Sequence, residues 1–203
     1  MRLFILGTTG RTGRALVAQA CERGHQITAF VRSPQKLGEL RERVNVRQGD
    51  PRSVAELREA LAGHDAVVSA LGPPGLGRTT VLRDGARSTV AAMQAERVRR
   101  LLVISMGALF QDAGILAALL RSTVLRNVAE DAAEMERVVM ASELDWTIVR
   151  PPRLTNGQLT GDYQVKDGYM PHGRLSLSRA DVAHFLLGEV ERGEHVRRIV
   201  GIA

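Results

Sequence analysis

The stretch that decides the fold is Gly7-Thr8-Thr9-Gly10-Arg11-Thr12-Gly13. It follows a short apolar run at residues 3–6 and precedes residues 12–23, whose apolar spacing and terminal Gly24 favour a helix. The spacing G-x-x-G-x-x-G allows a tight turn, a close backbone approach to a phosphate, and packing of the helix on the strand. Because a helix start offers unpaired N–H groups and a positive dipole end, the stretch predicts a strand–turn–helix unit that binds an anion.

The rest of the chain repeats this alternation of apolar runs and helical patterns. Strands are expected at residues 3–6, 26–31, 44–48, 65–71, 101–105, 144–149 and 196–202. Helices are expected at residues 12–23, 34–43, 53–63 and 79–97, within 115–142 as more than one helix, and from residue 178. Such alternation predicts a parallel sheet with right-handed crossovers. We therefore expect an α/β fold, a single doubly wound Rossmann domain over residues 1–203 with a mostly parallel sheet of six or seven strands.

Two helix starts carry capping signals, and one segment is rich in turns. Ser53 and Glu56 have the spacing of a capping box, and Ser178 and Asp181 have the spacing of a cap and the third helical residue. Residues 151–177 hold several pairs that favour turns, such as Asn156-Gly157, and are too few for a second domain. We expect this segment to form a substrate-side loop over the carboxyl edge of the sheet, where ligands bind in open α/β folds.

Composition limits the class of protein. The net charge is +6, but the positive excess lies in residues 1–100, and aromatic residues make up only 3%, so stacking platforms for bases are scarce. No apolar run is long enough to span a membrane. A single cysteine, Cys21, excludes an intramolecular disulfide and indicates a reducing compartment, the cytoplasm. We expect no nucleic-acid partner, no membrane partner, and, since the histidines are scattered, no metal.

The end of the second expected strand indicates which dinucleotide would bind. Proteins that prefer NAD place an acid there, about 20 residues after the glycine loop, to bind the ribose 2′-hydroxyl. This chain has Arg32 instead, with no acid nearby. A guanidinium can pair with a 2′-phosphate, and Lys36 and Arg11 could assist. The expected cofactor is therefore NADP(H), and the alternative is that Arg32 is a solvated surface residue.

Further candidates follow the other strands. Asp50, before Pro51, either accepts from the adenine amino group or caps the next helix. Gly72 could run beside the cofactor because it lacks a side chain. Ser105 either hydrogen-bonds the nicotinamide or substrate, or bonds the backbone. The expected cofactor contacts are Gly7, Thr9, Gly10, Arg11, Thr12, Gly13, Arg32, Lys36, Asp50, Pro51, Leu71, Gly72, Ser105, Met106 and Pro151.

The motifs together resemble the atypical short-chain dehydrogenase/reductase group, including NmrA-like proteins. The resemblance covers nearly the whole chain and is carried by the glycine loop, Val31-Arg32, Gly49-Asp50 and Ser105-Met106-Gly107-Ala108. Within the group, the chain is most similar to the branch of biliverdin-IXβ and NADPH-dependent flavin reductases. The stretches that carry this are Thr79-Thr80-Val81, Gly85-Ala86-Arg87, Val90-Ala91-Ala92-Met93, Pro151-Pro152, Leu159-Thr160-Gly161-Asp162-Tyr163 and Asp181-Val182-Ala183-His184-Phe185.

The resemblance extends more fully to the residues that bind the cofactor than to those that bind the substrate. The family's cofactor residues match at Gly7, Thr9, Gly10, Arg11, Thr12, Arg32, Asp50 and Gly72. Met106 stands where the family has a serine, with Ser105 one position earlier, and the two pocket histidines of the family fall on Ala132 and Arg153. The resemblance therefore implies flavin reduction more strongly than biliverdin reduction.

The tyrosine route of short-chain dehydrogenases is not expected. Tyr163 and Lys166 are three residues apart instead of four, and the helix that should carry the pair has Ala132 and Glu136. Glu136 and the nearby acids Glu130, Asp131 and Glu134 are interpreted as a solvated helix face. Flavin reduction needs no such pair, since hydride passes from the nicotinamide C4 to the flavin N5. The catalytic candidates are Ser105 and Arg153, although a surface arginine is the alternative for Arg153.

These observations give two hypotheses of function. The first is an NADPH-dependent reductase acting on a flavin or similar flat aromatic acceptor, which includes FMN, riboflavin, quinone and biliverdin. The second is a non-catalytic NmrA-type NADP(H) sensor that signals through a protein partner. Residues 108–125 are unusually apolar and form either that partner surface or a lid over the pocket. We expect a monomer or a weak homo-oligomer.

Overall fold

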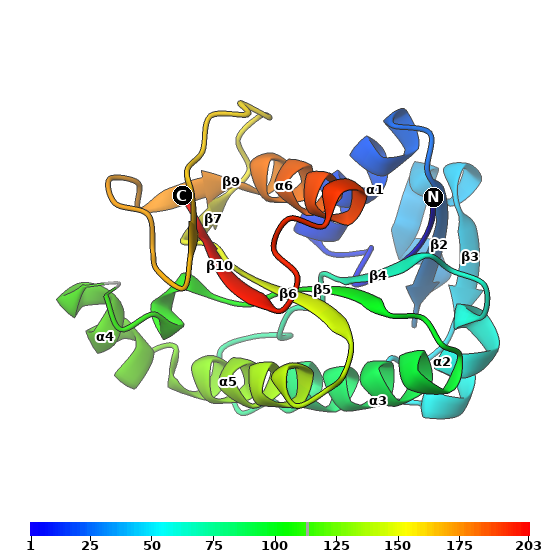
Figure 1. Ribbon diagram of the computed structural model, residues 1–203, viewed down its shortest axis with the longest axis horizontal. Helices are drawn as coiled ribbons and strands as arrows, with labels where there is room; N and C mark the ends of the chain where they lie inside the picture. The colour runs from blue at the N-terminus through cyan, green and yellow to red at the C-terminus, as the bar shows by residue number, and fades with distance from the viewer. Residues whose placement is uncertain (113) are drawn as a thin grey trace.

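The computed structural model describes every residue except residue 113, and every side chain except those of residues 113 and 115–118. A central sheet is enclosed between two layers of helices (Figure 1). One layer packs α1 (Arg11–Glu22) against α6 (Arg179–Arg192). The other layer contains α2 (Val54–Leu61), α3 (Val81–Ala95) and α5 (Arg126–Met140). This is the doubly wound α/β architecture that the sequence predicts.

The described residues place eight strands in the central sheet, in the order β3-β2-β1-β4-β5-β6-β10-β8. Seven are parallel: β1 (Arg2–Leu6), β2 (Gln26–Val31), β3 (Asn45–Gln48), β4 (Ala66–Ser69), β5 (Arg100–Ile104), β6 (Asp145–Arg150) and β10 (Arg198–Ile202). The expected count of six or seven was too low, because β8 (Val165–Asp167) pairs antiparallel with β10. A strand of three residues between turns carries no alternation that a sequence pattern could reveal.

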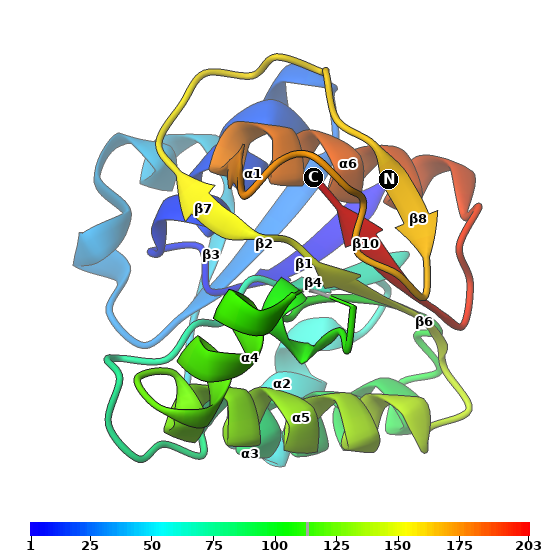
Figure 2. The same ribbon diagram turned by 90° about the vertical axis from the view of Figure 1, so that its left-hand side faces the viewer.

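The turn-rich segment contains further strands. Besides β8, it holds β7 (Arg153–Thr155), which pairs with β9 (Ser176–Ser178) in a small separate sheet. The expectation of a loop throughout residues 151–177 was therefore wrong at eight residues, since Ser178, the last residue of β9, lies just beyond the segment. Figure 2 shows the chain between β7 and β8 running across the side of the sheet that α6 covers.

The remaining helices are short. Residues 34–43 form η1 (Pro34–Arg43), two 3₁₀ turns joined at Gly38, whose φ is +60°. After β5 come η2 (Gly107–Leu109) and α4 (Ile115–Ser122). Since α4 ends before α5 begins, the expectation that residues 115–142 do not form one helix is confirmed. Among the described helices, none is long and apolar enough to cross a membrane.

Alternating side chains of the parallel strands fill a core on each face of the sheet. Phe4, Val67, Val103 and Ile148 belong to the core that α2, α3 and α5 cover. Their neighbours in sequence, such as Ile5 and Val149, belong to the core under α1 and α6. Parallel strands buried on both faces explain why the strands are near-continuous apolar runs.

Buried Asp181 ties the turn-rich segment to α6. It lies in the first turn of α6, where Ser178 is the N-cap and accepts from its N–H, as the capping signal predicts. Its carboxylate accepts from the N–H groups of Thr160 and Gly161, at 2.8 and 2.9 Å, and from Ser178 Oγ at 2.7 Å. Burial by itself would raise the pKa of Asp181, but these hydrogen bonds outweigh it and hold the pKa below its ordinary value.

Replacing Asp181 with asparagine should destabilise the protein by about 1–3 kcal/mol near neutral pH, since buried donors would lose a charged acceptor. The folded-state pKa is lowered, so the stabilisation is complete above the unfolded pKa of about 3.9 and is lost as the pH falls through the folded value. Urea unfolding at several pH values measures both effects. Asp162→Asn, on a side chain 79% exposed, is the control and should change stability little. An equal loss in both variants would contradict the role of Asp181.

Candidate cofactor and active site

The glycine loop joins β1 to α1 so tightly that side chains cannot fit at two of its glycines. Gly7 has a φ of +77°, and a Cβ there would lie 2.3 Å from the carbonyl oxygen of Ala70. A Cβ on Gly13 would lie 2.2 Å from the carbonyl oxygen of Gly7. The loop is thus pressed between α1 and the end of β4, as the interpretation of Gly7 and Gly13 predicts.

The start of α1 is left free to bind an anion. Gly10 is the N-cap and supplies no side-chain cap, and no acid lies in the first turn. The first backbone bond runs from Arg14 N–H to Gly10 O, at 2.9 Å. In the described chain, the N–H groups of Arg11, Thr12 and Gly13 make no hydrogen bond. These donors and the helix dipole fit a pyrophosphate, while Thr9 lies in the same turn.

The described structure leaves two cations exposed beyond β2. The side chains of Arg32 and Lys36 are exposed and make no hydrogen bond or ion pair with any described residue. Arg14, from α1, donates to the carbonyl oxygens of Lys36 and Leu37 and so fixes the turn that carries Lys36. The positions of both cations are therefore compatible with a phosphate near the end of β2.

Asp50 is not the cap of the helix that follows it. Its carboxylate binds Arg52, through Nη2 at 2.7 Å and Nε at 3.1 Å, and this bond is the main cause that lowers the pKa of Asp50. Ser53 is the N-cap of α2, and Glu56 accepts from Asp50 N–H at 2.8 Å. The alternative that Asp50 caps the helix was therefore wrong. A reciprocal capping box was also wrong, because Glu56 accepts from the N–H of Asp50 and not from that of Ser53. The buried residue Pro51 lies between Asp50 and Arg52.

Ser105 lies at the carboxyl end of β5 with its hydroxyl buried. Its backbone N–H donates to Val149 O at 2.8 Å, but its Oγ has no hydrogen-bond partner among the described residues. The alternative of a hydroxyl bonded to backbone is therefore not found. Gly107 N–H donates to Pro151 O at 2.7 Å, and joins the ends of β5 and β6. Met106 packs against the core under α3 and α5.

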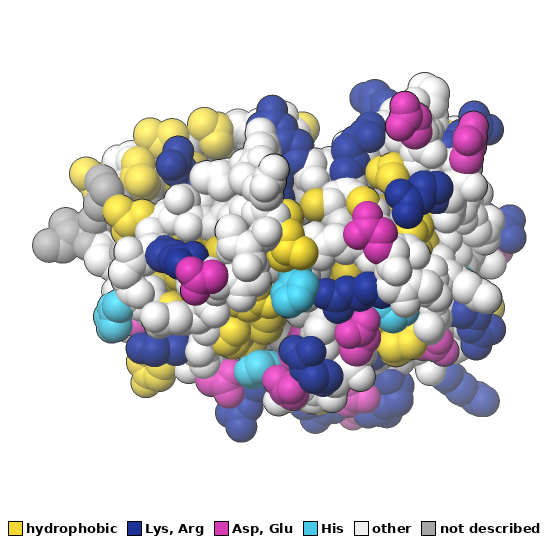
Figure 3. Space-filling view, turned by 90° about the horizontal axis from the view of Figure 1, so that it is seen from above, with side chains coloured by type: hydrophobic (Ala, Val, Ile, Leu, Met, Phe, Trp, Pro, Cys, Tyr) yellow, Lys and Arg dark blue, Asp and Glu magenta, His cyan; other side chains and the backbone are white. Residues whose placement is uncertain are grey.

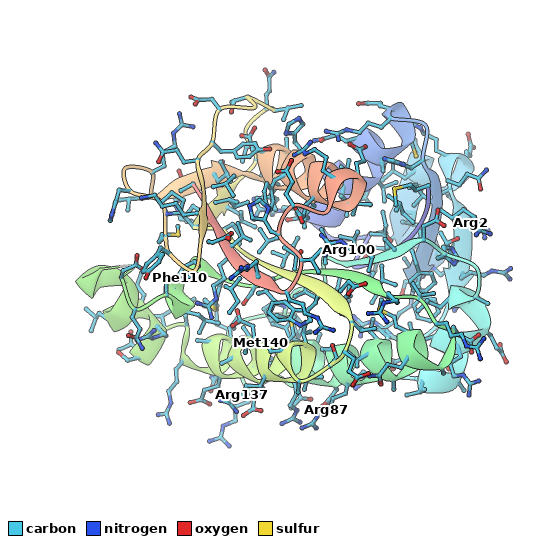
Figure 4. The ribbon with its side chains drawn as sticks, in the orientation of Figure 1. Arg2, Arg87, Arg100, Phe110, Arg137 and Met140 are labelled. Atoms are coloured by element: carbon cyan, nitrogen blue, oxygen red, sulfur yellow. The ribbon has the colours of Figure 1, made fainter. Side chains whose placement is uncertain are left out.

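Two arginines near the end of β6 differ in their surroundings. Arg153, the sequence candidate, is exposed and has no partner in the described structure. Arg150 is half-buried: its Nε and Nη2 donate to Glu136 at 2.9 and 2.5 Å, and its guanidinium lies 4.5 Å from the centroid of the Phe110 ring. Figure 4 labels Phe110 near the α4 end of the molecule. Sequence reasoning missed this pair.

The expectation of a solvated acidic face on α5 was wrong for two residues. Glu136 and Asp131 are 2% and 4% exposed. Asp131 accepts from the N–H groups of Leu82 and Arg83, both at 3.0 Å, and thereby caps the start of α3. A signal was present in the sequence: helical spacing places Asp131 and Glu136 close to the apolar stripe that contains Ala132 and Met135.

A hollow of about 1170 Å³ lies where α3, α4 and α5 begin or end. Five arginines line it: Arg78, Arg83, Arg121, Arg126 and Arg137. Two of these arginines pair with acids of α5, Arg126 with Glu130 and Arg137 with Glu134. None of residues 7–13 lines the hollow, so it is separate from the anion-binding turn.

On the face seen from above, basic side chains lie among acidic ones and are not gathered in one patch (Figure 3).

The candidate residues come from neighbouring parallel strands, whose carboxyl ends meet at one edge of the sheet. Gly7, Arg32, Gly72 and Ser105 follow four different strands there, and Leu71 packs on the core nearby. A family model described as NAD(P)H-binding matches residues 7–192. The chain belongs to this NAD(P)H-binding family. The expected class of cofactor, an NAD(P)H dinucleotide, is therefore confirmed.

Known proteins match nearly the whole chain, in sequence or in fold. The chain is 29% identical to the uncharacterized protein YwnB of Bacillus subtilis, over 96% of this chain and 94% of that one. A Rossmann-fold NAD(P)-binding protein from Shigella flexneri superposes with a TM-score of 0.77 at 26% identity, over 100% of this chain and 92% of that one. ChuY, an anaerobillin reductase from Escherichia coli, has a TM-score of 0.82 at 18% identity, over 100% and 96%. At that identity, ChuY shows the fold alone.

Gly72→Ala should weaken NADPH binding about tenfold without destabilising the protein, if the backbone there passes close to the cofactor. A Cβ at Gly72 meets no atom of the described residues within 4 Å, so a loss of affinity is expected to come from contact with the ligand. Gly75→Ala, in the same loop and equally open, is the matched control. Fluorescence titration gives the dissociation constants, and thermal melting tests the fold. Equal affinities in the two variants would remove Gly72 from the site.

Proposed function

We propose that the protein is an NADPH-dependent reductase that delivers hydride to a flavin or a similar flat conjugated acceptor, such as FMN, riboflavin, a quinone or biliverdin. The observation that supports this most strongly concerns α5. Ala132 is buried and Glu136 is held by Arg150, so the tyrosine and lysine of the dehydrogenase route have no equivalent on this face. An acceptor that takes its proton from water needs no such pair.

The residues of this chain would bind and orient the reactants. NADPH supplies the hydride when bound. The start of α1 would hold its pyrophosphate, and the unpaired Ser105 hydroxyl would hydrogen-bond the nicotinamide or the acceptor. Asp50, although paired with Arg52, would accept from the adenine amino group. The preference for NADPH over NADH is supported by Arg32 and Lys36, two exposed cations without partners in the described structure. The location we propose is the cytoplasm.

A second candidate function is the non-catalytic NADP(H) sensor. It is favoured by exposed apolar side chains near the end of α4, where Leu119 is 57% and Val124 is 56% exposed. Such residues are typical of a partner surface. The apolar side chains of residues 115–118, which contributed to this expectation, lie outside the described residues. Only the reductase turns over an acceptor, so activity separates the two functions.

NADPH oxidation followed by absorbance, with FMN or riboflavin as acceptor, should run well above an enzyme-free control. Alignment of the acceptor against the cofactor would accelerate transfer relative to solution. NADPH binding is measured in the same sample. Binding without turnover of flavin, quinone or biliverdin would reject the reductase and leave the sensor.

Arg32→Glu should raise the dissociation constant for NADPH about 100-fold while changing that for NADH far less, since an acid would repel the 2′-phosphate and bind the 2′-hydroxyl. Titrations with both nucleotides measure the ratio. Arg87→Glu makes the same charge change on α3, where Figure 4 labels the residue, and should leave the ratio unchanged. If Arg32→Glu weakens both nucleotides equally, Arg32 does not recognise the phosphate.

A further inference from the structure

Ser105 and Arg150 lie side by side on one face of the sheet. The register of β5 and β6 pairs Ile104 with Val149, so the next residue on each strand faces the other side. That side is the one covered by α3 and α5, because Val103 and Ile148 belong to its core. Both polar side chains therefore lie at the carboxyl edge of the same face, where the proposed reductase would hold its acceptor.

The guanidinium of Arg150 is fixed in place. Two of its N–H groups bind the two oxygens of Glu136, and Phe110 lies against its face. The side chains of Arg150 and Glu136 are 13% and 3% exposed. A guanidinium has five N–H donors, and the other three have no acceptor among the described residues. Arg150 is thus a rigid cation with donors to spare.

Stability alone does not account for this pair. A buried ion pair recovers its desolvation cost only with good geometry, and apolar residues of similar size usually serve a core as well or better. A preorganised cation is most valuable where negative charge develops during a reaction. The neighbouring Ser105 hydroxyl, also without a described partner, points to the same use of this edge.

We propose that Arg150 binds the atom of the acceptor that becomes negatively charged on reduction, and that Glu136 is a positioning residue for Arg150. This proposal rests on the reductase function. The acceptor receives a hydride with its electron pair from a C–H bond of the cofactor, which is oxidised as that bond breaks. A new bond to hydrogen forms on the acceptor, which is now anionic. The reduced acceptor then takes a proton from water, and Arg150 remains fully protonated throughout.

The test uses a double variant, Arg150→Gln with Glu136→Gln, which leaves no lone buried charge and allows the amides to pair. We expect kcat with FMN to fall about 100-fold and KM to change little, because the lost interaction forms only as charge develops. Arg150→Lys keeps a cation and should retain more of kcat. Thermal melting confirms that each variant is folded.

A binding measurement provides a readout that needs no turnover. Under anaerobic conditions, the double variant should bind oxidised FMN as the unaltered protein does, but bind reduced, anionic FMN at least about tenfold more weakly. Equal loss for both forms would make Arg150 a structural residue and overturn the proposal. The proposal would also be overturned if Arg153→Gln lowered kcat and the double variant did not.

The outcomes also separate a failure of this proposal from a failure of the reductase function on which it rests. If the unaltered protein reduces FMN and the double variant keeps both kcat and the preference for reduced FMN, only the role of Arg150 fails. If the unaltered protein binds NADPH but neither reduces FMN nor distinguishes its two forms, the flavin reductase function and the role of Arg150 both fail.

Discussion

The close contact of the glycine loop with its two neighbours is the constraint on which the rest of the structure depends. Gly7 touches the backbone at the end of β4, and Gly13 touches Gly7, so α1 can leave β1 in only one direction. β1 pairs with β2 on one side and with β4 on the other. The chain therefore reverses its winding beside this loop, at the kind of position where open α/β sheets bind their ligands. The unpaired N–H groups of α1 face a site that the topology itself creates.

The sequence contains enough information to predict elements that depend on local patterns. The glycine spacing identifies the turn, and apolar runs identify the inner parallel strands, since both faces of those strands are largely buried, whereas the edge strand β3 is mostly exposed. The cap at Ser178 also follows from neighbouring residues alone. The three-residue strands β7, β8 and β9 could not be predicted in this way, because their pairing is set by distant partners and not by alternation within the strand.

The candidate site divides along the same line. The candidate cofactor residues lie on the glycine loop and at the strand ends that follow it, so their positions can be predicted from the order of the strands in the sequence. The substrate side depends on contacts between elements. In the sequence, nothing distinguishes Arg150 from other arginines at strand ends; only the fold shows its contacts with Glu136 and Phe110. Asp131 and Glu136 share a helix with exposed acids; their place beside the apolar stripe sets them apart in the sequence, but their partners on α3 and β6 are known only from the fold. An acid at the edge of an apolar stripe is thus a prompt to search for a buried partner.

The ends of the sheet affect how the protein can associate. β3 and β8, the two outermost strands, have four and three residues and include the charged side chains Arg47, Lys166 and Asp167. Short, charged edges discourage another chain from adding a strand by backbone hydrogen bonding. β8 also runs against its neighbour, so it interrupts the regular parallel ladder at that end. Copies of this protein are thereby protected from joining into a continuous sheet, which leaves helical surfaces as the route to assembly and lowers the risk of fibrous aggregation.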